Sequence, residues 1–345
     1  MVLIVSLLLG CSSSDTGVPS SPGDTDTGEP ATSHPPGETG EPSETGEPSE
    51  TGETGVPTET GETGATETGE TGPPALDCDA VPAGPRPYAV LDGLYAAEDF
   101  AFDGEYLISH YEAALFRQTY PPGTSEAFAP TEGGPGGPAS LRMLATGDLV
   151  YANVDTATLY RIGPDGSTTV VYGGLGYPMG IDIHPDGTVF LSDLAGVLRI
   201  DPYTFAVDVV ANLGVMANGM TFSEDYTTLY FGTYDGILAL PVDATGNATG
   251  EASLWAETDG GEILGMGVDA CGNVYALNRG DRLLRFSGPG AEPELILEMP
   301  GAWMTNIQWG SGVGGWGETL LYVTDRDAQA PAYYEIDVGV PSKPY

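Results

Sequence analysis

Polar side chains recur where short apolar segments of this chain begin and end. Six equivalent positions directly before an apolar segment hold Glu98, Ala139, Met179, Asn218, Leu264 and Thr305. A second set closes the segments that follow: His110, Asn153, Asp193, Thr233, Asn278 and Asp325. Every member of the second set is polar, so the chain could bind a polar ligand or perform acid–base chemistry wherever these ends meet.

His110 is the side chain best able to act as an acid, a base or a ligand near neutral pH. A lone histidine at a strand end is more often a hydrogen-bonded structural residue, and this alternative stays open. Glu262 lies two residues before Leu264 and could act as a base if its loop reaches the same place. Asp193 and Asp325 could have a functional role, but aspartate after a strand is also a common turn former. The sequence contains no phosphate-binding glycine loop, Cys/His metal cluster or Gly-x-Ser-x-Gly nucleophile motif.

The elements that carry these residues repeat six times between residues 98 and 325. Each copy has an apolar strand, a tight polar turn and a second apolar strand, and the closing polar residues are 40 to 47 positions apart. This period, together with Gly/Asp turns, is typical of β-propeller blades. We therefore predict an all-β fold, a six-bladed β-propeller over residues 80–345.

The sixth copy is one strand short of a four-stranded blade, because the chain ends soon after YYEIDVG. The segment PYAVLDG at 87–93 is the natural donor, since pairing beside the last strand would close the ring and remove exposed strand edges. An all-β sandwich is the alternative, but it would not explain six evenly spaced copies. In a propeller, both sets of residues would surround one mouth of the central channel, and the Gly/Asp turns would lie on the opposite face.

The first 77 residues are expected to lie outside the propeller. Residues 1–11, MVLIVSLLLGC, are too short an apolar run to span a bilayer. Their Leu-Leu-Gly-Cys end resembles a bacterial lipobox, so we expect a lipoprotein signal peptide with the lipid on Cys11; a plain cleaved signal peptide is the alternative. Residues 12–77 repeat Thr-Gly-Glu units without Lys, Arg or aromatic residues, which predicts a disordered linker. The expected location is the bacterial cell envelope, as an outer-membrane or surface lipoprotein.

The charge restricts the partners of the propeller. Fourteen of the 50 acidic residues precede residue 76, which leaves 36 acidic against 10 basic residues and a net charge of −26. Such a surface repels nucleic acid and anionic lipid, so we expect no nucleic-acid partner and a monomer. If Cys11 carries lipid, Cys78 and Cys271 remain as the only pair available for a disulfide, although the sequence does not show whether that bond forms.

Several copies, EDFAFDG, ANGMTFSEDYTTLY, MGVDACGNVYALN and MTNIQWGSG with LLYVT, resemble the regucalcin and gluconolactonase family of senescence-marker-protein propellers. The resemblance covers residues 90–330. It implies a divalent cation, usually calcium, at the channel mouth. It also implies hydrolysis of sugar lactones by water that the metal and a carboxylate activate.

Transferred residue by residue, the resemblance supplies only part of this metal site. Glu98 matches the glutamate ligand and Asn218 matches an asparagine ligand. Met179 stands where an asparagine is expected, and Leu264 stands where the aspartate ligand and base is expected. Because calcium needs six or more oxygen ligands, the expected cofactor is at most one divalent cation in an incomplete site.

The incomplete metal site leaves two possible functions. In the first, the chain binds a small molecule, a glycan or a protein at the propeller mouth and attaches to the membrane through lipid on Cys11. In the second, it is a metal-dependent hydrolase of sugar lactones with an altered ligand set. Fold alone does not choose between them, and the losses at Met179 and Leu264 favour binding.

Overall fold

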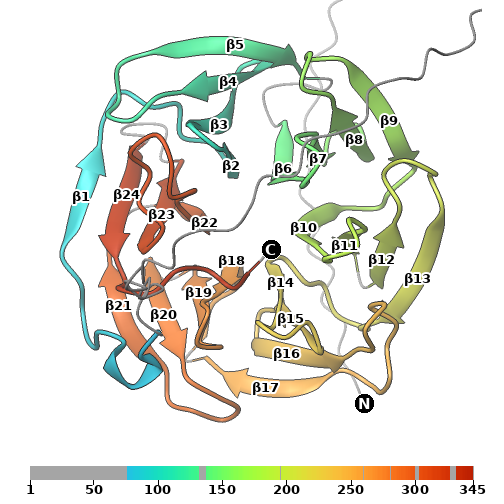
Figure 1. Cartoon of the computed structure of the whole chain (residues 1–345). Helices are drawn as coiled ribbons and strands as arrows, with labels where there is room; N and C mark the ends of the chain where they lie inside the picture. Colours follow the sequence, from blue (N-terminus) through green and yellow to red (C-terminus); the bar gives the residue numbers. More distant parts are fainter. Residues whose placement is uncertain are drawn as a thin grey trace, which may run out of the picture. The chain divides into compact units, whose positions relative to one another are not determined.

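The computed structural model describes residues 76–131, 137–194, 196–258, 260–279, 281–299, 303–326 and 332–344. These residues form six four-stranded antiparallel sheets around a central axis (Figure 1), which confirms the predicted six-bladed propeller. Cys11 and the predicted linker up to residue 75 lie outside the described residues. Within the described part of the chain, no helix is long and apolar enough to cross a membrane.

Five blades are each built from four consecutive strands. Those of blades 1 to 3 are β2 (Phe100–Asp103), β3 (Tyr106–Tyr111), β4 (Ala114–Gln118), β5 (Ser125–Pro130), β6 (Pro138–Met143), β7 (Leu149–Asn153), β8 (Thr158–Ile162), β9 (Thr168–Gly173), β10 (Pro178–Ile183), β11 (Val189–Asp193), β12 (Gly196–Ile200) and β13 (Val207–Asn212). Those of blades 4 and 5 are β14 (Met220–Phe222), β15 (Thr228–Gly232), β16 (Gly236–Pro241), β17 (Ser253–Glu257), β18 (Ile263–Val268), β19 (Val274–Asn278), β20 (Arg282–Phe286) and β21 (Glu294–Glu298).

The sixth blade joins the two ends of the propeller. It contains β22 (Met304–Trp309), β23 (Leu320–Asp325) and β24 (Ala332–Asp337), and β1 (Tyr88–Leu91) completes it in the order β1-β24-β23-β22. The register of the closing pair runs from Tyr88 opposite Ile336 to Leu91 opposite Tyr333. Figure 1 shows β1 on the outer side of β24. The predicted donor strand is therefore confirmed, and the closure pairs the edge that β24 would otherwise expose.

The hydrophobic core lies between neighbouring blades, around the innermost strands. Alternate side chains of a strand point to opposite faces, and one set from each first strand packs into this core. Its six equivalent members are no more than 3% exposed: Phe100, Leu141, Ile181, Met220, Met266 and Ile307. This packing holds the strand starts in a fixed ring, which is what a site at the channel mouth needs.

The C-terminal tail returns to the axis of the ring (Figure 1) and carries a buried lysine. The Lys343 side chain is 1% exposed. Its Nζ donates to Asp182 Oδ2, to Phe222 O at 3.1 Å and to Thr221 Oγ1 at 3.3 Å. A buried charge is tolerated only when it is paired and hydrogen-bonded. The tail therefore ties blades 3 and 4 together near the axis.

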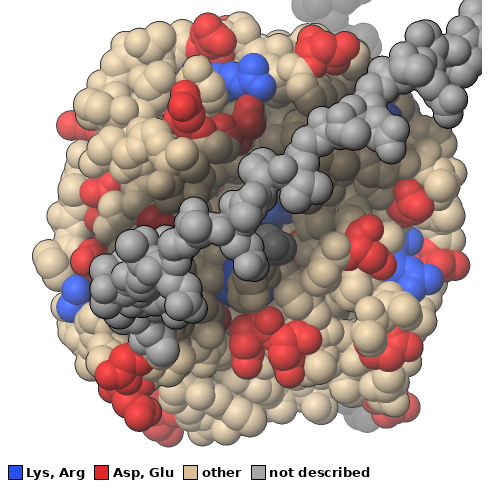
Figure 2. All heavy atoms as spheres, viewed as in Figure 1, with Lys and Arg blue, Asp and Glu red and all other residues tan. Residues whose placement is uncertain are grey.

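Acidic side chains are distributed over the visible face of the molecule, with few basic ones among them (Figure 2). This agrees with the ten cations that the sequence sets against 36 carboxylates after residue 75. Because cations are scarce, a place where two arginines gather stands out against the rest of the surface.

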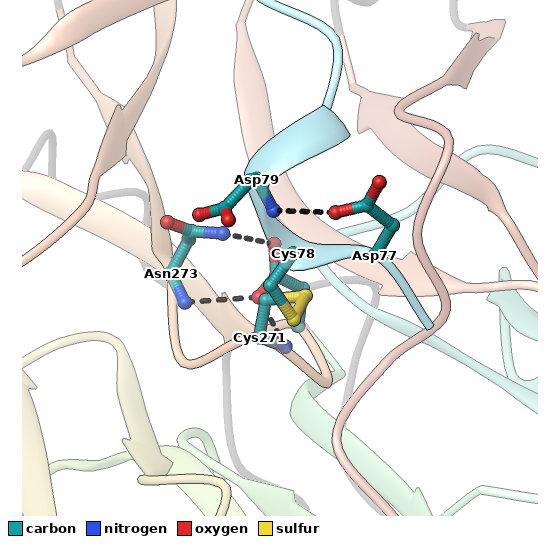
Figure 3. The surroundings of a disulfide bond; sticks show 6 residues. Asp77, Cys78, Asp79, Cys271 and Asn273 are labelled. Carbon is teal, nitrogen blue, oxygen red and sulfur yellow. Dashed lines mark hydrogen bonds between the residues drawn. A yellow bond between two sulfur atoms is a disulfide. The ribbon is translucent and has the colours of Figure 1, made fainter. Parts of the chain in front are cut away.

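A disulfide joins Cys78, at the start of the 3-10 turn η1 (Cys78–Ala80), to Cys271 (Figure 3). The Cα atoms are 5.5 Å apart, and 193 positions separate the two residues in sequence. Cys271 lies in the turn between β18 and β19, where its backbone N–H donates to Asp269 Oδ1 at 2.9 Å. The segment that leads into the propeller is thus fixed to the turn face of blade 5.

Candidate functional site

The first strands of the six blades begin around one opening of the central channel. All six residues that the sequence placed before these strands line the narrow channel there: Glu98, Ala139, Met179, Asn218, Leu264 and Thr305. All but Thr305 also line a wider cavity of about 440 Å³. The repeat therefore brings Glu98 and Asn218 into one cavity, although 120 positions separate them in sequence.

Two arginines form ion pairs with two of the carboxylates that line this cavity, Glu98 and Glu262. Arg326 Nη1 forms an ion pair with Glu98 Oε2. Arg279 Nη1 donates to Glu262 Oε2 at 2.8 Å, and Asn218 Nδ2 donates to Glu262 Oε1 at 3.2 Å. Glu262 thus reaches the mouth, where it bridges a neutral amide and a guanidinium. Glu98 and Glu262 therefore each have a cationic partner supplied by the chain itself, while Asp155 is a third carboxylate of the lining.

The second strands of blades 5 and 6 position these arginines. Arg279 follows the end of β19 and Arg326 follows the end of β23. The backbone N–H of Arg279 donates to Glu262 O at 2.8 Å, and that of Arg326 donates to Trp303 O at 3.1 Å. The Arg326 guanidinium also lies 4.8 Å from the centre of the Trp303 ring. This stacking and the ion pair hold Arg326 over the mouth.

The rest of the cavity wall is largely apolar and partly exposed. Tyr177, Met216 and Trp303 line it with 41%, 49% and 48% of their surface exposed. Met179 and Leu264 form its inner part and are 9% exposed. Large apolar side chains left open around a cavity mark a binding surface more often than a structural one.

Residues 191–326 match the family described as SMP-30/Gluconolactonase/LRE-like region. The predicted family resemblance is confirmed. No curated protein matches the sequence.

Solved structures share the fold of this gluconolactonase-like propeller. A gluconolactonase from Xanthomonas campestris is 17% identical with a TM-score of 0.60, covering 74% of this chain and 89% of its own. Regucalcin from Agrobacterium tumefaciens, described as a calcium-binding protein, is 20% identical with a TM-score of 0.58, covering 76% and 97%. Virginiamycin B lyase from Staphylococcus aureus is 13% identical with a TM-score of 0.52, covering 73% and 98%. At these identities the likeness establishes the propeller fold.

The residues at the mouth do not fit the divalent cation that the family resemblance implies. Met179 and Leu264 contribute no oxygen to the channel they line. Glu98 and Glu262 are each paired with a guanidinium, whose positive charge opposes a second cation nearby. Among the described residues, no group of three or more His, Cys, Asp or Glu is arranged to hold a metal ion.

Two members of the closing polar set hold the aromatic wall in place. Asp193 Oδ1 accepts from the backbone N–H of Tyr177 at 2.6 Å. Asp325 Oδ1 accepts from the backbone N–H of Trp303 at 2.8 Å, and its Oδ2 accepts from Tyr334 Oη at 2.9 Å. These carboxylates orient the loops that enter the first strands and are not among the described residues that line the cavity.

Four other predicted mouth residues bond to backbone groups. Asn153 Oδ1 accepts from Thr156 N at 3.0 Å, Thr233 Oγ1 donates to Gly236 O at 2.8 Å, Asn278 Nδ2 donates to Gly260 O at 2.7 Å and Thr305 Oγ1 donates to Ala97 O at 3.3 Å. The polar ends of the second strands therefore fasten loops together. Of these four side chains, Thr305 alone is among the described residues that line the channel.

His110 is buried at the end of β3 and is not among the described residues that line the cavity. Burial lowers the pKa of its imidazole. The ring lies against Gly137, where an added Cβ would come within 2.3 Å of His110 Cε1. His110 is therefore packed into the mouth-side structure, away from Glu98 and Glu262.

Sequence reasoning missed Arg279 and Arg326. The available signal was their position, because each directly follows a closing polar residue, Asn278 or Asp325. It also missed Asp99, which is fully buried and accepts from the backbone N–H of Leu141 at 2.7 Å. Burial raises the pKa of Asp99, although its ion pair with Arg142 acts in the opposite direction.

Proposed function

We propose that this gluconolactonase-like propeller is a lipid-anchored, extracytoplasmic binding module whose mouth receives a small molecule, a glycan or a protein without a metal ion. The observation that carries this proposal is the pairing of two mouth carboxylates, Glu98 and Glu262, with Arg326 and Arg279. A hydrolase that relied on a metal would need these oxygens for the cation and for activating water.

The anchor is supported by Leu-Leu-Gly-Cys at residues 8–11. Mass spectrometry of the mature N-terminus would test it, because lipidation predicts a modified Cys11 as the first residue. An unmodified N-terminus beyond residue 11 would support the plain signal peptide instead.

Calorimetric titration of the full chain with calcium, manganese and zinc tests the metal-free site. The proposal predicts no saturable heat at millimolar metal, because Leu264 and Met179 supply no side-chain oxygen and Glu98 and Glu262 are each paired with an arginine. Micromolar calcium binding that is lost in Glu98→Ala or Asn218→Ala would overturn it.

The second candidate is a hydrolase of sugar lactones, favoured by the position of Glu262 in the cavity beside Asn218. A general base must lie within reach of the attacking water, and Glu262 is the described carboxylate best placed for this. Acid release from a panel of lactones, compared between the unmodified chain and Glu262→Gln, decides between the two candidates. Turnover that Glu262→Gln abolishes would favour the hydrolase, and absence of turnover favours binding.

A further inference from the structure

We infer that the mouth recognises a monocarboxylate carried on an aromatic or aliphatic body. The inference rests on the proposed binding function and names the class of ligand. Two features of the cavity carry it, the arginine pair Arg279 and Arg326 and the apolar wall formed by Tyr177, Met216 and Trp303. Each feature selects one half of such a ligand.

Each of the two arginines has further N–H donors that could bind a carboxylate. A guanidinium carries five N–H donors, and the ion pairs with Glu262 and Glu98 each use the Nη1 nitrogen. The side chains of Arg279 and Arg326 are 59% and 41% exposed. Their remaining edges can therefore receive a carboxylate in the bidentate geometry that guanidinium favours.

The apolar wall selects the body of the ligand. Trp303 presents a half-exposed ring beside the Arg326 guanidinium, and Met216 and Tyr177 line the same cavity. An aromatic or branched aliphatic group placed against these side chains would remove exposed apolar surface from water. A free inorganic anion would leave this surface exposed and gain nothing from it.

The charge of the molecule disfavours a ligand with several negative charges. Glu98, Glu262 and Asp155 line the cavity together with the two arginines, and the propeller as a whole is strongly acidic. A polyanion such as nucleic acid or a diphosphate would be repelled by this field. A monoanion meets less of this repulsion, and its carboxylate can approach the exposed edges of Arg279 and Arg326.

The probe for this inference is 2-naphthoate, and its neutral partner is 2-naphthylmethanol. Binding to the full chain is followed by calorimetry and by quenching of tryptophan fluorescence, since Trp303 is the half-exposed tryptophan at the mouth. We expect naphthoate to bind at least tenfold more tightly than the alcohol. We expect Arg279→Gln and Arg326→Gln each to weaken naphthoate roughly tenfold, the loss of one charge-assisted contact, and to leave the alcohol unchanged.

Arg161→Gln is the matched control, because the Arg161 guanidinium also stacks on an aromatic ring, 4.5 Å from the centre of Tyr203, and is not among the described residues of the mouth cavity. It should leave naphthoate affinity unchanged. Arg279 is the more exposed arginine, so Arg279→Gln remains informative if Arg326→Gln fails to fold.

Equal affinity for the acid and the alcohol, or naphthoate binding that survives both arginine substitutions, would overturn the ligand class and leave a binding function in place. Absence of naphthoate binding would overturn it as well. Saturable calcium binding at Glu98 and Asn218 is a separate result that would overturn the proposed function itself.

Discussion

The Arg326 guanidinium forms an ion pair with Glu98 in the cavity where the family resemblance assigns a metal ligand. Leu264, in the same ring of strand starts, stands where the family resemblance expects an aspartate, so a carboxylate is absent there. Both residues weaken metal binding at the mouth, because Arg326 neutralises a carboxylate and Leu264 supplies none. This explains why a gluconolactonase-like propeller can retain Glu98 and Asn218 without offering calcium a complete set of ligands.

Restoring the missing oxygen and removing the guanidinium together should recover metal binding. We expect the double variant Leu264→Asp/Arg326→Gln to bind calcium with a submillimolar dissociation constant, while each single variant binds at least tenfold more weakly, because either change alone leaves the site short of an oxygen or beside a fixed positive charge. Calorimetry on the three variants measures this. Equal calcium affinity in the Arg326→Gln single variant and the double variant would show that Leu264 is not the missing ligand.

The sequence predicted the six residues of the inner ring because equivalent positions of a repeat occupy equivalent places around the axis. It could not predict that Arg279 and Arg326 turn toward Glu262 and Glu98, because that direction depends on contacts between blades. The part played by Asp325 shows the same limit: its position at a strand end was predictable, whereas its bond to the Trp303 backbone depends on the path of the following loop.

At the scale of elements, the C-terminal tail is as much a part of the propeller as its strands. Lys343 contacts Asp182 in β10 and Phe222 in β14, and burial lowers the pKa of its ammonium group. Nothing in the repeat indicates this contact, because the tail follows the last copy. The lysine is the only one in the chain, and it lies at the axis.

We expect substitution of this lysine to destabilise the fold, and a second substitution at Asp182 to restore much of the stability. Lys343→Met leaves the Asp182 carboxylate buried without its cation, which we expect to lower the free energy of unfolding by about 3–5 kcal/mol. Lys343→Met/Asp182→Asn should recover much of this loss, because no buried charge remains. Urea denaturation of the single and double variants measures both effects. Additive losses in the double variant would show that the two residues stabilise the fold independently.

At the scale of the whole molecule, radial repetition and one closing strand account for the architecture, and both were predictable. The number of repeated strand pairs gives the number of blades. The strand missing from the last blade identified β1 as the segment that pairs with β24. The disulfide was predictable only as a pairing of the remaining cysteines, since their 5.5 Å Cα separation depends on the path of the segment before β1.

Hydrogen-bonded carboxylates in the turns make the stability of the fold sensitive to low pH. Hydrogen bonds from the Thr245 hydroxyl and from the backbone of Asn247 and Thr245 lower the pKa of Asp243 to about 2. A carboxylate with a lowered pKa in the folded state stabilises the fold above its unfolded pKa of about 3.8, and this contribution is lost as pH falls toward 2. Hydrogen bonds, first of all that from the Ser223 hydroxyl, also lower the pKa of Asp225. Asp99 acts in the opposite sense, because burial raises its pKa.

We therefore expect the urea midpoint to fall steadily between pH 4 and pH 2, and we expect Asp243→Asn to make this decline shallower. Denaturation curves at half-unit intervals of pH measure it. A midpoint that rises on acidification would mean that the buried Asp99 outweighs the turn carboxylates.

The most direct test of a mouth in which arginines replace the metal is a crystal structure of the full chain grown in millimolar calcium. We predict that Arg326 contacts Glu98, that Arg279 contacts Glu262, and that no calcium lies between Glu98 and Asn218. A calcium ion bound by Glu98 and Asn218, with Arg326 turned away into solvent, would contradict the account.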